Sequence, residues 1–256
     1  MIILNKNILI VGAAGRIGGA TAKKLFSSGA NLVLSDFNLK NLVSISNNFQ
    51  SKFSNQFNLI KTDITNEKEI TELIKKAESI MGTIDGALFA TYPRSKQWGN
   101  SIENLKLKYI NEDLANQLGS AIYFSKEILE SFKKNKKGSL VHLSSIYGLR
   151  APKFGIYENT EMISPIEYSA IKSGIISICK WLAKYYSNNN IRVNCVSPGG
   201  ILDDQPDNFI KKYREQCTNI GMLSAEQIAE AILFLLSEKS SAINGENIVI
   251  DDGWSL

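Results

Sequence analysis

Short runs of consecutive apolar residues alternate along the chain with longer stretches in which apolar residues recur every three or four positions. A short continuous run is typical of a strand buried on both faces of a parallel sheet, and the longer periodic stretches are typical of amphipathic helices. The run at 8–11, for example, precedes apolar positions 22, 25 and 26, which share one helix face. We predict strands at 8–11, 31–36, 57–63, 84–89, 139–143, 191–196 and 247–250.

Seven strands joined by crossover helices predict an α/β fold, a Rossmann-like doubly wound parallel seven-stranded sheet with helices on both faces. The chain of 256 residues is 44% apolar, which suffices for one large core, and no Gly/Ser/Pro-rich linker or repeat divides it. We therefore expect a single domain over 1–256. In such sheets, ligands bind at the carboxyl ends of the strands.

Charge and cysteine content narrow the classes of function. The 29 basic and 25 acidic residues give a formal net charge of +4, which is mild for this length and implies no nucleic-acid partner. Three widely spaced cysteines and a single histidine argue against a metal site and favour reduced thiols in the cytoplasm. The first residues lead into a strand without a signal-peptide layout, and no apolar run reaches ~18 residues, so we expect no membrane partner.

A glycine-rich turn follows the first predicted strand. Gly12, Gly15 and Gly18 stand between that strand and the amphipathic helix. Glycines at these positions allow a tight turn, bring backbone N–H groups to a pyrophosphate and let the helix pack closely on the strand. The order of strand, glycine turn and helix therefore predicts a dinucleotide site.

Three charged residues bear on the choice of dinucleotide. Asp36 ends the second predicted strand, where a carboxylate would bond the ribose hydroxyls of the adenosine; the alternative is an ordinary turn aspartate. Because a 2′-phosphate would meet a like charge there, Asp36 predicts NAD, with NADP less favoured. Arg16, beside the glycine turn, could pair with the pyrophosphate or tolerate a 2′-phosphate. Asp63, at the end of the third predicted strand, could approach the adenine or be a turn residue.

Tyr168 and Lys172 are four residues apart, so on a helix they project from the same face. A phenol titrates near pH ~10 and exchanges protons at neutral pH only if its anion is stabilised, which a neighbouring ammonium can do. Such a pair alone is more often solvated helix surface. Here the glycine turn precedes it, and Ser145 lies upstream near the end of a strand. His142, within that apolar strand, is more typical of a core histidine.

These features, in this order, resemble the short-chain dehydrogenase/reductase family over essentially the whole chain. The resemblance rests on the glycine turn, Asp36, Asp63, Ser145, Tyr168 with Lys172, Ser197-Pro198-Gly199 and the closing segment 244–253. It implies an enzyme in which the nicotinamide cofactor carries out the hydride transfer and the protein positions and polarises the substrate.

The resemblance also implies residue roles. Tyr168 would be the general acid/base, Ser145 would bond the reacting oxygen, and Lys172 would lower the pKa of Tyr168 and bind the nicotinamide ribose. Asn116 would hold a proton-relay water, unless it is ordinary helix surface. Cofactor contacts are implied for Gly12, Gly15, Arg16, Ile17, Gly18, Asp36, Asp63, Lys172, Pro198, Gly199 and Ile201.

Three features depart from the usual family pattern. Phe89-Ala90-Thr91-Tyr92 stands where the family has Asn-Asn-Ala-Gly, so contacts there must differ. The glycine spacing is G-x-x-G-x-x-G, as in the family's extended, sugar-nucleotide-modifying branch. The separation between Ser145 and Tyr168 is long, and we expect the extra residues, roughly 150–165, to form a flap over the substrate, with a substrate loop at roughly 201–223.

These departures look most like a bacterial subgroup, the flagellin-modification oxidoreductases found with nonulosonic-acid synthesis genes. That likeness implies a sugar or sugar derivative as the small-molecule substrate, in the synthesis of glycan precursors. The alternatives are a reductase of another carbonyl, such as a 3-oxoacyl thioester, and an NAD-binding regulatory protein without turnover. The family usually forms homodimers or homotetramers through the helix that carries the tyrosine and through the last strand.

Three cations follow the fourth and fifth predicted strands. We expect Arg94, Arg150 and Lys153 to lie near the mouth of the site and to bind an anionic or heavily hydroxylated ligand. The alternative is that all three are solvated loop cations.

Overall fold

One parallel sheet of seven strands forms the centre of the computed structural model, which describes residues 2–256. The strand order is β3-β2-β1-β4-β5-β6-β7, and every neighbouring pair is parallel. The predicted doubly wound α/β fold is confirmed. The strands are β1 (Asn7–Val11), β2 (Asn31–Asp36), β3 (Phe57–Lys61), β4 (Gly86–Phe89), β5 (Gly138–Leu143), β6 (Ile191–Pro198) and β7 (Asn247–Ile250).

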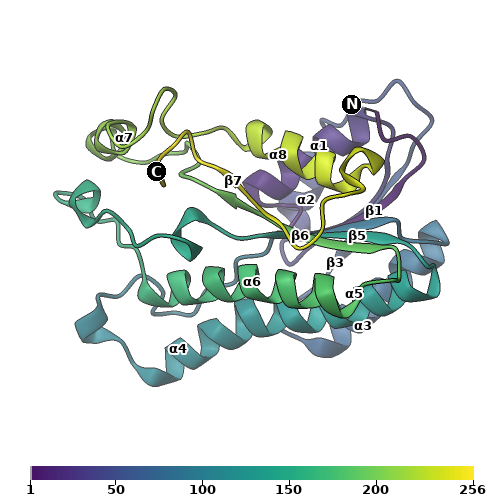
Figure 1. Ribbon diagram of the computed structural model, residues 1–256, viewed down its shortest axis with the longest axis horizontal. Helices are drawn as coiled ribbons and strands as arrows, with labels where there is room; N and C mark the ends of the chain where they lie inside the picture. The colour runs from purple at the N-terminus through teal and green to yellow at the C-terminus, as the bar shows by residue number, and fades with distance from the viewer. Residues whose placement is uncertain (1) are drawn as a thin grey trace.

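Helices cover both faces of the sheet. In Figure 1, α1, α2 and α8 lie on one side, and α3, α4, α5 and α6 lie on the other. Short turns join them: η1 (Ile102–Asn104), η3 (Ile146–Gly148), η4 (Phe154–Tyr157), η5 (Glu238–Ser240) and a π-helical turn, η2 (Ala115–Gly119). The helices are α1 (Arg16–Ser27), α2 (Leu39–Ser46), α3 (Glu67–Met81), α4 (Leu107–Leu114), α5 (Ser120–Lys134), α6 (Ile166–Tyr185), α7 (Asp207–Arg214) and α8 (Ala225–Leu236).

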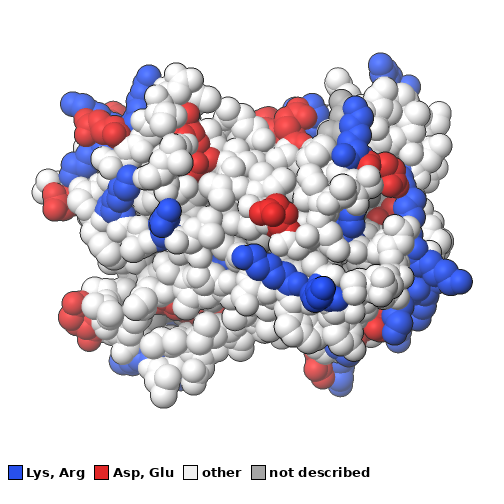
Figure 2. All heavy atoms as spheres, viewed as in Figure 1, with Lys and Arg blue, Asp and Glu red and all other residues white. Residues whose placement is uncertain are grey.

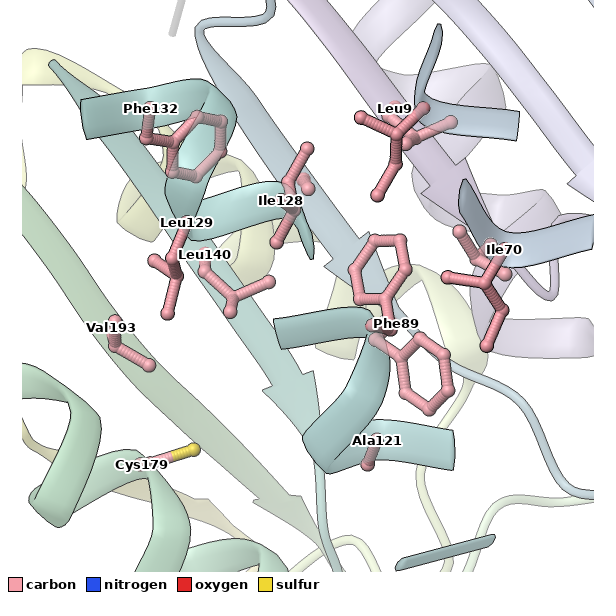
Figure 3. Close-up of a cluster of buried hydrophobic side chains, with 14 of the residues drawn as sticks. Leu9, Ile70, Phe89, Ala121, Ile128, Leu129, Phe132, Leu140, Cys179 and Val193 are labelled. Atoms are coloured by element: carbon pink, nitrogen blue, oxygen red, sulfur yellow. The ribbon is translucent and has the colours of Figure 1, made fainter. Parts of the chain in front are cut away.

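Each central strand contributes to two cores because its side chains alternate between the faces of the sheet. Leu9 of β1 joins the core beneath α3, α5 and α6, whereas Ile8 and Ile10 join the core beneath α1 and α8. Figure 3 shows the first core, where Leu9 and Phe89 from the strands meet Ile128 and other side chains from the helices. Burial on both faces is the reason the strands read as uninterrupted apolar runs.

The strand order reverses beside β1, which pairs with β2 on one side and with β4 on the other. This reversal opens a crevice at the carboxyl ends of these strands. Gly12 ends β1 with a φ of 86°, and a Cβ there would lie 2.5 Å from the carbonyl oxygen of Ala90. A Cβ on Gly18 would overlap the carbonyl oxygen of Gly12. The glycine turn therefore packs main chain against main chain.

Several predicted boundaries were wrong by one or two residues. The strand predicted at 57–63 ends at Lys61, and beyond it the Asp63 N–H bonds the Glu69 carboxylate at 2.7 Å. The strand predicted at 84–89 begins at Gly86, and the one predicted at 191–196 continues to Pro198. Asn116, predicted in a helix, lies in the π-helical turn between α4 and α5.

Charged side chains are scattered over the face shown in Figure 2, where basic, acidic and uncharged residues alternate. No helix within residues 2–256 is long and apolar enough to cross a membrane.

We expect Gly18→Ala to destabilise the protein, because the added methyl group would overlap the main chain of Gly12. Overpacking of this kind typically costs about 1–3 kcal/mol. The matched control is Gly155→Ala, where a Cβ would meet no atom within 4 Å. Urea unfolding of both variants checks the prediction, and equal midpoints for the two would contradict it.

Candidate active site

The glycine turn presents the start of α1 to a cavity of about 550 Å³ at the reversal of the strand order. Side chains cap α2, α3 and α8 through Asn38, Asn66 and Ser224. Within the described chain, α1 has no side-chain cap, like α4, α5, α6 and α7, and it has no acidic residue in its first turn. The main-chain N–H groups of this turn thus suit a phosphate, whose charge the helix dipole also favours. The residues present fit a dinucleotide.

Asp36 and Asp63 line the same cavity, together with Gly12, Gly15 and Asn116. The carboxylate of Asp36 accepts hydrogen bonds from the Ala14 N–H at 3.0 Å and the Asn38 N–H at 2.9 Å. These bonds fix the carboxylate at the end of β2 while the side chain stays partly exposed to the cavity.

Arg16 pairs with Asp203, in the loop that follows β6. The guanidinium therefore joins the glycine turn to the loop predicted as the substrate loop. Arg16, Ile17 and Gly18 also line a second cavity of about 900 Å³, along with Pro198, Gly199 and Ile201. The structure thus brings the predicted cofactor residues to two neighbouring cavities.

Tyr168, Lys172 and Ser145 meet in the larger cavity. Tyr168 lies in the first turn of α6, and the Lys172 Nζ lies 5.5 Å from the centroid of its ring. Ser145 follows β5 and directly precedes η3, where its Oγ accepts from the Tyr147 N–H at 3.2 Å. η3 packs closely on α6, because a Cβ on Gly148 would lie 2.7 Å from the carbonyl carbon of Lys172.

Burial controls the electrostatics of this group. It raises the pKa of Tyr168, while a hydrogen bond with Ser145 acts in the opposite direction. Burial also lowers the pKa of Lys172 to about 8. The Lys172 ammonium donates to the Leu143 carbonyl at 3.0 Å. The sequence led us to expect Lys172 to lower the Tyr168 pKa; in this structure burial dominates, and the phenol pKa is raised.

Aromatic side chains surround Tyr168, and no sequence pattern predicted a role for them. The Tyr92 ring centroid lies 5.6 Å from that of Tyr168, Trp98 lies at 6.0 Å and Tyr147 at 6.4 Å, all nearly perpendicular to it. Tyr92 ends the segment that replaces Asn-Asn-Ala-Gly. That departure was the available signal, but it did not reveal which way the ring points.

The insertion at 150–165 packs on the C-terminal segment. Arg150 Nε donates to the Ser255 carbonyl and Lys153 Nζ to the Trp254 carbonyl, both at 3.2 Å. Lys153 also lies 4.7 Å from the Trp254 ring centroid. Contacts with the C-terminal segment therefore position both cations, and their role in binding a ligand stays a prediction. Arg94 does line both cavities.

His142 is fully buried in β5, where its Nε2 lies 2.8 Å from the Ser125 Oγ. The Phe89 ring packs at 5.6 Å, edge to face. Burial lowers the pKa of His142 to about 3, and the Lys172 charge adds to this effect. The prediction of a core histidine agrees with this placement.

Comparison with known proteins shows what the chain is similar to. The family model for enoyl-(acyl carrier protein) reductases matches residues 12–255. The post-translational flagellin modification protein A of Campylobacter coli is 41% identical over 253 residues, 98% of this chain and 99% of that protein. The 3-oxoacyl-(acyl-carrier-protein) reductase of Buchnera aphidicola is 30% identical over 266 residues and covers 100% of both chains.

A solved structure gives the same fold with a ligand. A short-chain dehydrogenase from Leptospira borgpetersenii with bound NAD⁺ is 28% identical and has a TM-score of 0.86, covering 100% of this chain and 94% of that one. The flagellin-modification relative confirms the subgroup resemblance predicted from the sequence.

We expect His142 to make the protein less stable as the pH falls. Its folded pKa of about 3 lies below the unfolded value of ~6.5, so the unfolded chain binds the proton and stability decreases below pH ~6.5. Between pH 7 and pH 5 the loss should be about 2 kcal/mol. Urea unfolding of wild type and His142→Gln across this range tests it: the variant should lose correspondingly less, and parallel curves would contradict the assignment.

Proposed function

Because this chain belongs to the short-chain dehydrogenase/reductase family, and is an oxidoreductase of that family, we propose that it transfers a hydride between NAD(H) and a hydroxyl or carbonyl group of a sugar derivative. The observation that carries the proposal is the shared cavity, whose wall joins the glycine turn to Ser145, Tyr168 and Lys172. A cofactor seated at the turn and a substrate at Tyr168 would thus lie in one space.

We propose that NAD is held by residues at both ends of this space. The turn formed by Gly12, Gly15, Ile17 and Gly18 would receive the pyrophosphate. Arg16 would lie beside the pyrophosphate when its ion pair with Asp203 opens. Nicotinamide supplies the hydride acceptor or donor. The remaining contacts would come from Asp36 on the adenosine ribose, Asp63 near the adenine, Lys172 on the nicotinamide ribose, and Pro198, Gly199 and Ile201 at the nicotinamide.

The chain's own residues would handle the proton. Tyr168 would donate it to, or accept it from, the reacting oxygen, which Ser145 would hold by a hydrogen bond. Lys172 would stabilise the phenolate by its charge. Asn116, at the π-helical turn that lines the adjacent cavity, would hold a relay water for the proton.

A sugar derivative suits the walls around Tyr168. Aromatic rings offer apolar faces to the C–H groups of a sugar ring, while their hydroxyls and neighbouring polar groups bond its oxygens. Trp98, Tyr147 and Gln205 provide both kinds of surface, and Arg94 adds a cation for an anionic substituent. The name of the Campylobacter coli relative supports a role in the synthesis of a flagellin or other surface glycan precursor.

A second candidate is the reduction of a 3-oxoacyl thioester. It is favoured by the similarity to the Buchnera aphidicola reductase. An apolar groove of about 790 Å³ also adjoins the cavity and shares Tyr147, Ser164 and Pro165 with it. Such a groove could accept an acyl chain.

We further propose one cytoplasmic domain over 1–256, with 150–165 as the substrate flap and 201–223 as the substrate loop. Assembly into a homodimer or homotetramer is supported by the outer face of α6. There, Trp181 and Tyr185 are exposed and stack with their ring centroids 4.8 Å apart.

Cofactor titration followed by turnover assays tests the function. NADH fluorescence should change on binding, and a panel of oxidised and reduced sugar derivatives should give turnover where 3-oxoacyl thioesters do not. Preferred turnover of thioesters would replace the first candidate by the second. Dinucleotide binding without turnover of either class would favour a regulatory protein.

We expect Tyr168→Phe to remove most turnover while the fold and NAD binding remain. Phenylalanine keeps the ring and its packing but loses the proton, and general acid/base catalysis typically contributes about 10²–10⁴-fold. The kcat of the variant on the best substrate, with melting temperature and NADH titration as controls, checks this. Turnover within a few-fold of wild type would overturn the mechanism.

We expect wild type to bind NAD more tightly than NADP, and Asp36→Asn to reduce that preference. The amide removes the charge that would repel a 2′-phosphate, and its single oxygen keeps an acceptor for one of the Ala14 and Asn38 N–H groups. Dissociation constants for both cofactors measure the effect. A tenfold preference of wild type for NADP, about 1.4 kcal/mol, would show that Arg16 dominates and that the assignment is wrong.

A further inference from the structure

Lys172 is a buried cation without a carboxylate partner. Its ammonium donates to the Leu143 carbonyl, and no acidic side chain in the described part of the chain, residues 2–256, forms an ion pair with it. The side chain is only 4% exposed, and a buried unpaired ammonium is costly. Groups other than an anion therefore surround the ammonium in the position that the proposed mechanism needs.

Two aromatic rings lie beside the Lys172 ammonium, which has no carboxylate partner among the described residues. The Lys172 Nζ lies 5.5 Å from the ring centroid of Tyr168 and 5.8 Å from that of Tyr92. The two rings are nearly perpendicular, at 81°. Both distances fall within the range in which a cation is attracted to the π face of a ring. Tyr168 is the proposed proton carrier, so Tyr92 is the ring that is free of another role.

The chain fixes Tyr92 firmly. Its ring packs edge to face on Trp98, with centroids 5.2 Å apart. Three residues further on, Ser95 donates from both its N–H and its hydroxyl to the buried carboxylate of Asp113, at 2.7 Å each. On the other side, the preceding Ala90 carbonyl abuts the glycine turn at Gly12. The ring is therefore anchored on both sides of its short segment.

We propose that Tyr92 is a positioning residue that holds the Lys172 ammonium beside Tyr168 through the face of its ring, in place of the contacts that an Asn-Asn-Ala-Gly segment would supply. This inference rests on the proposed function. It explains why an aromatic residue stands where the family pattern has a small one.

Burial lowers the pKa of Lys172 to about 8, so its charge at neutral pH depends on its surroundings. The π face of Tyr92 opposes the loss of that charge. The Arg94 guanidinium also lies over the Tyr92 ring, 5.4 Å from the centroid. Its positive charge repels the Lys172 ammonium and so opposes the effect of the ring. The titratable groups that face Lys172 are Tyr92 after β4, His142 on β5 and Tyr168 on α6. Behind them, Arg94 lies against Tyr92 and Tyr147 of η3 against Tyr168.

The test measures the ionisation of Lys172 directly, in the protein without ligands. Lysine labelled with ¹³C at Cε gives one NMR signal per lysine, and the signal missing in Lys172→Ala identifies the group. Tyr92→Phe keeps the ring and should leave the Lys172 pKa unchanged. Tyr92→Leu keeps apolar bulk without a π face and should lower that pKa by roughly one unit, the size of a desolvated cation–π contact.

A matched control is Tyr123→Leu, which removes the ring that faces Lys126 on the surface of α5, 4.9 Å away. It should leave the Lys172 signal unchanged. A Tyr92→Leu variant whose Lys172 pKa stays at the wild-type value or rises would overturn the proposal, as would a Tyr92→Phe variant that behaves like Tyr92→Leu.

Turnover provides the second readout. On the best substrate, Tyr92→Leu should lower kcat relative to wild type at neutral pH. The decrease should be smaller at acidic pH, where Lys172 is protonated in both proteins. Tyr92→Phe should restore the wild-type profile of kcat against pH. If wild type turns over nothing, the proposed function fails, while the NMR titration still decides the role of Tyr92. Equal kcat losses at every pH would mean that Tyr92 serves packing alone.

Discussion

The site depends on two places where main chain touches main chain without room for a side chain. A Cβ on Gly12 would lie 2.5 Å from the Ala90 carbonyl oxygen, and a Cβ on Gly148 would lie 2.7 Å from the Lys172 carbonyl carbon. The first contact sets the glycine turn against the end of β4, and the second sets η3 against α6. Together they determine how far the proposed cofactor end of the cavity lies from Ser145 and Tyr168. Contacts between main-chain atoms cannot adjust by rotating side chains, so they keep the distances within the site constant. This suits a site that must hold two reactants at a fixed distance and orientation.

The same close packing removes water, and the loss of water dominates the ionisation of the site. It moves the pKa of the phenol up and that of the ammonium down, so burial shifts both groups toward their uncharged forms. Any interaction that favours the Lys172 cation therefore bears directly on proton transfer at Tyr168. Aromatic faces can provide this without introducing a carboxylate that would repel a phenolate or an anionic substrate. An aromatic enclosure around the tyrosine and the lysine thus combines two requirements, a dry cavity and a retained positive charge.

The sequence predicted the fold well because its strongest signal, uninterrupted apolar runs, has one physical cause, burial on both faces of a parallel sheet. The pairing of Tyr168 with Lys172 was also predictable, since residues four apart on a helix must share a face. Strand ends were less predictable: the strand at Phe57–Lys61 ends two residues before Asp63, whose N–H bonds a side chain of α3. The contacts of Arg150 and Lys153 with the C-terminal segment were not predictable, because their partners lie about a hundred residues further along the chain and no local pattern records such a contact. The direction of the Tyr92 ring was equally hidden, as it is set by Trp98 and Asp113 together.

The wall of the cavity comes from segments far apart in sequence, and this has a consequence for specificity. Ile156 of the insertion, Phe209 and Tyr213 of α7 and Trp254 near the C-terminus form one small buried cluster with Ile146. Tyr147 bonds Tyr157 through their hydroxyls at 2.6 Å, and Trp254 stacks on Tyr213 with centroids 6.0 Å apart. Because Ile146 and Tyr147 directly follow Ser145, a change anywhere in this cluster alters the substrate wall beside the proposed reacting oxygen. The glycine turn and the Tyr168–Lys172 pair lie outside the cluster. Substrate choice can therefore change in such a protein through its insertion and its last residues while the groups that handle the hydride and the proton stay in place.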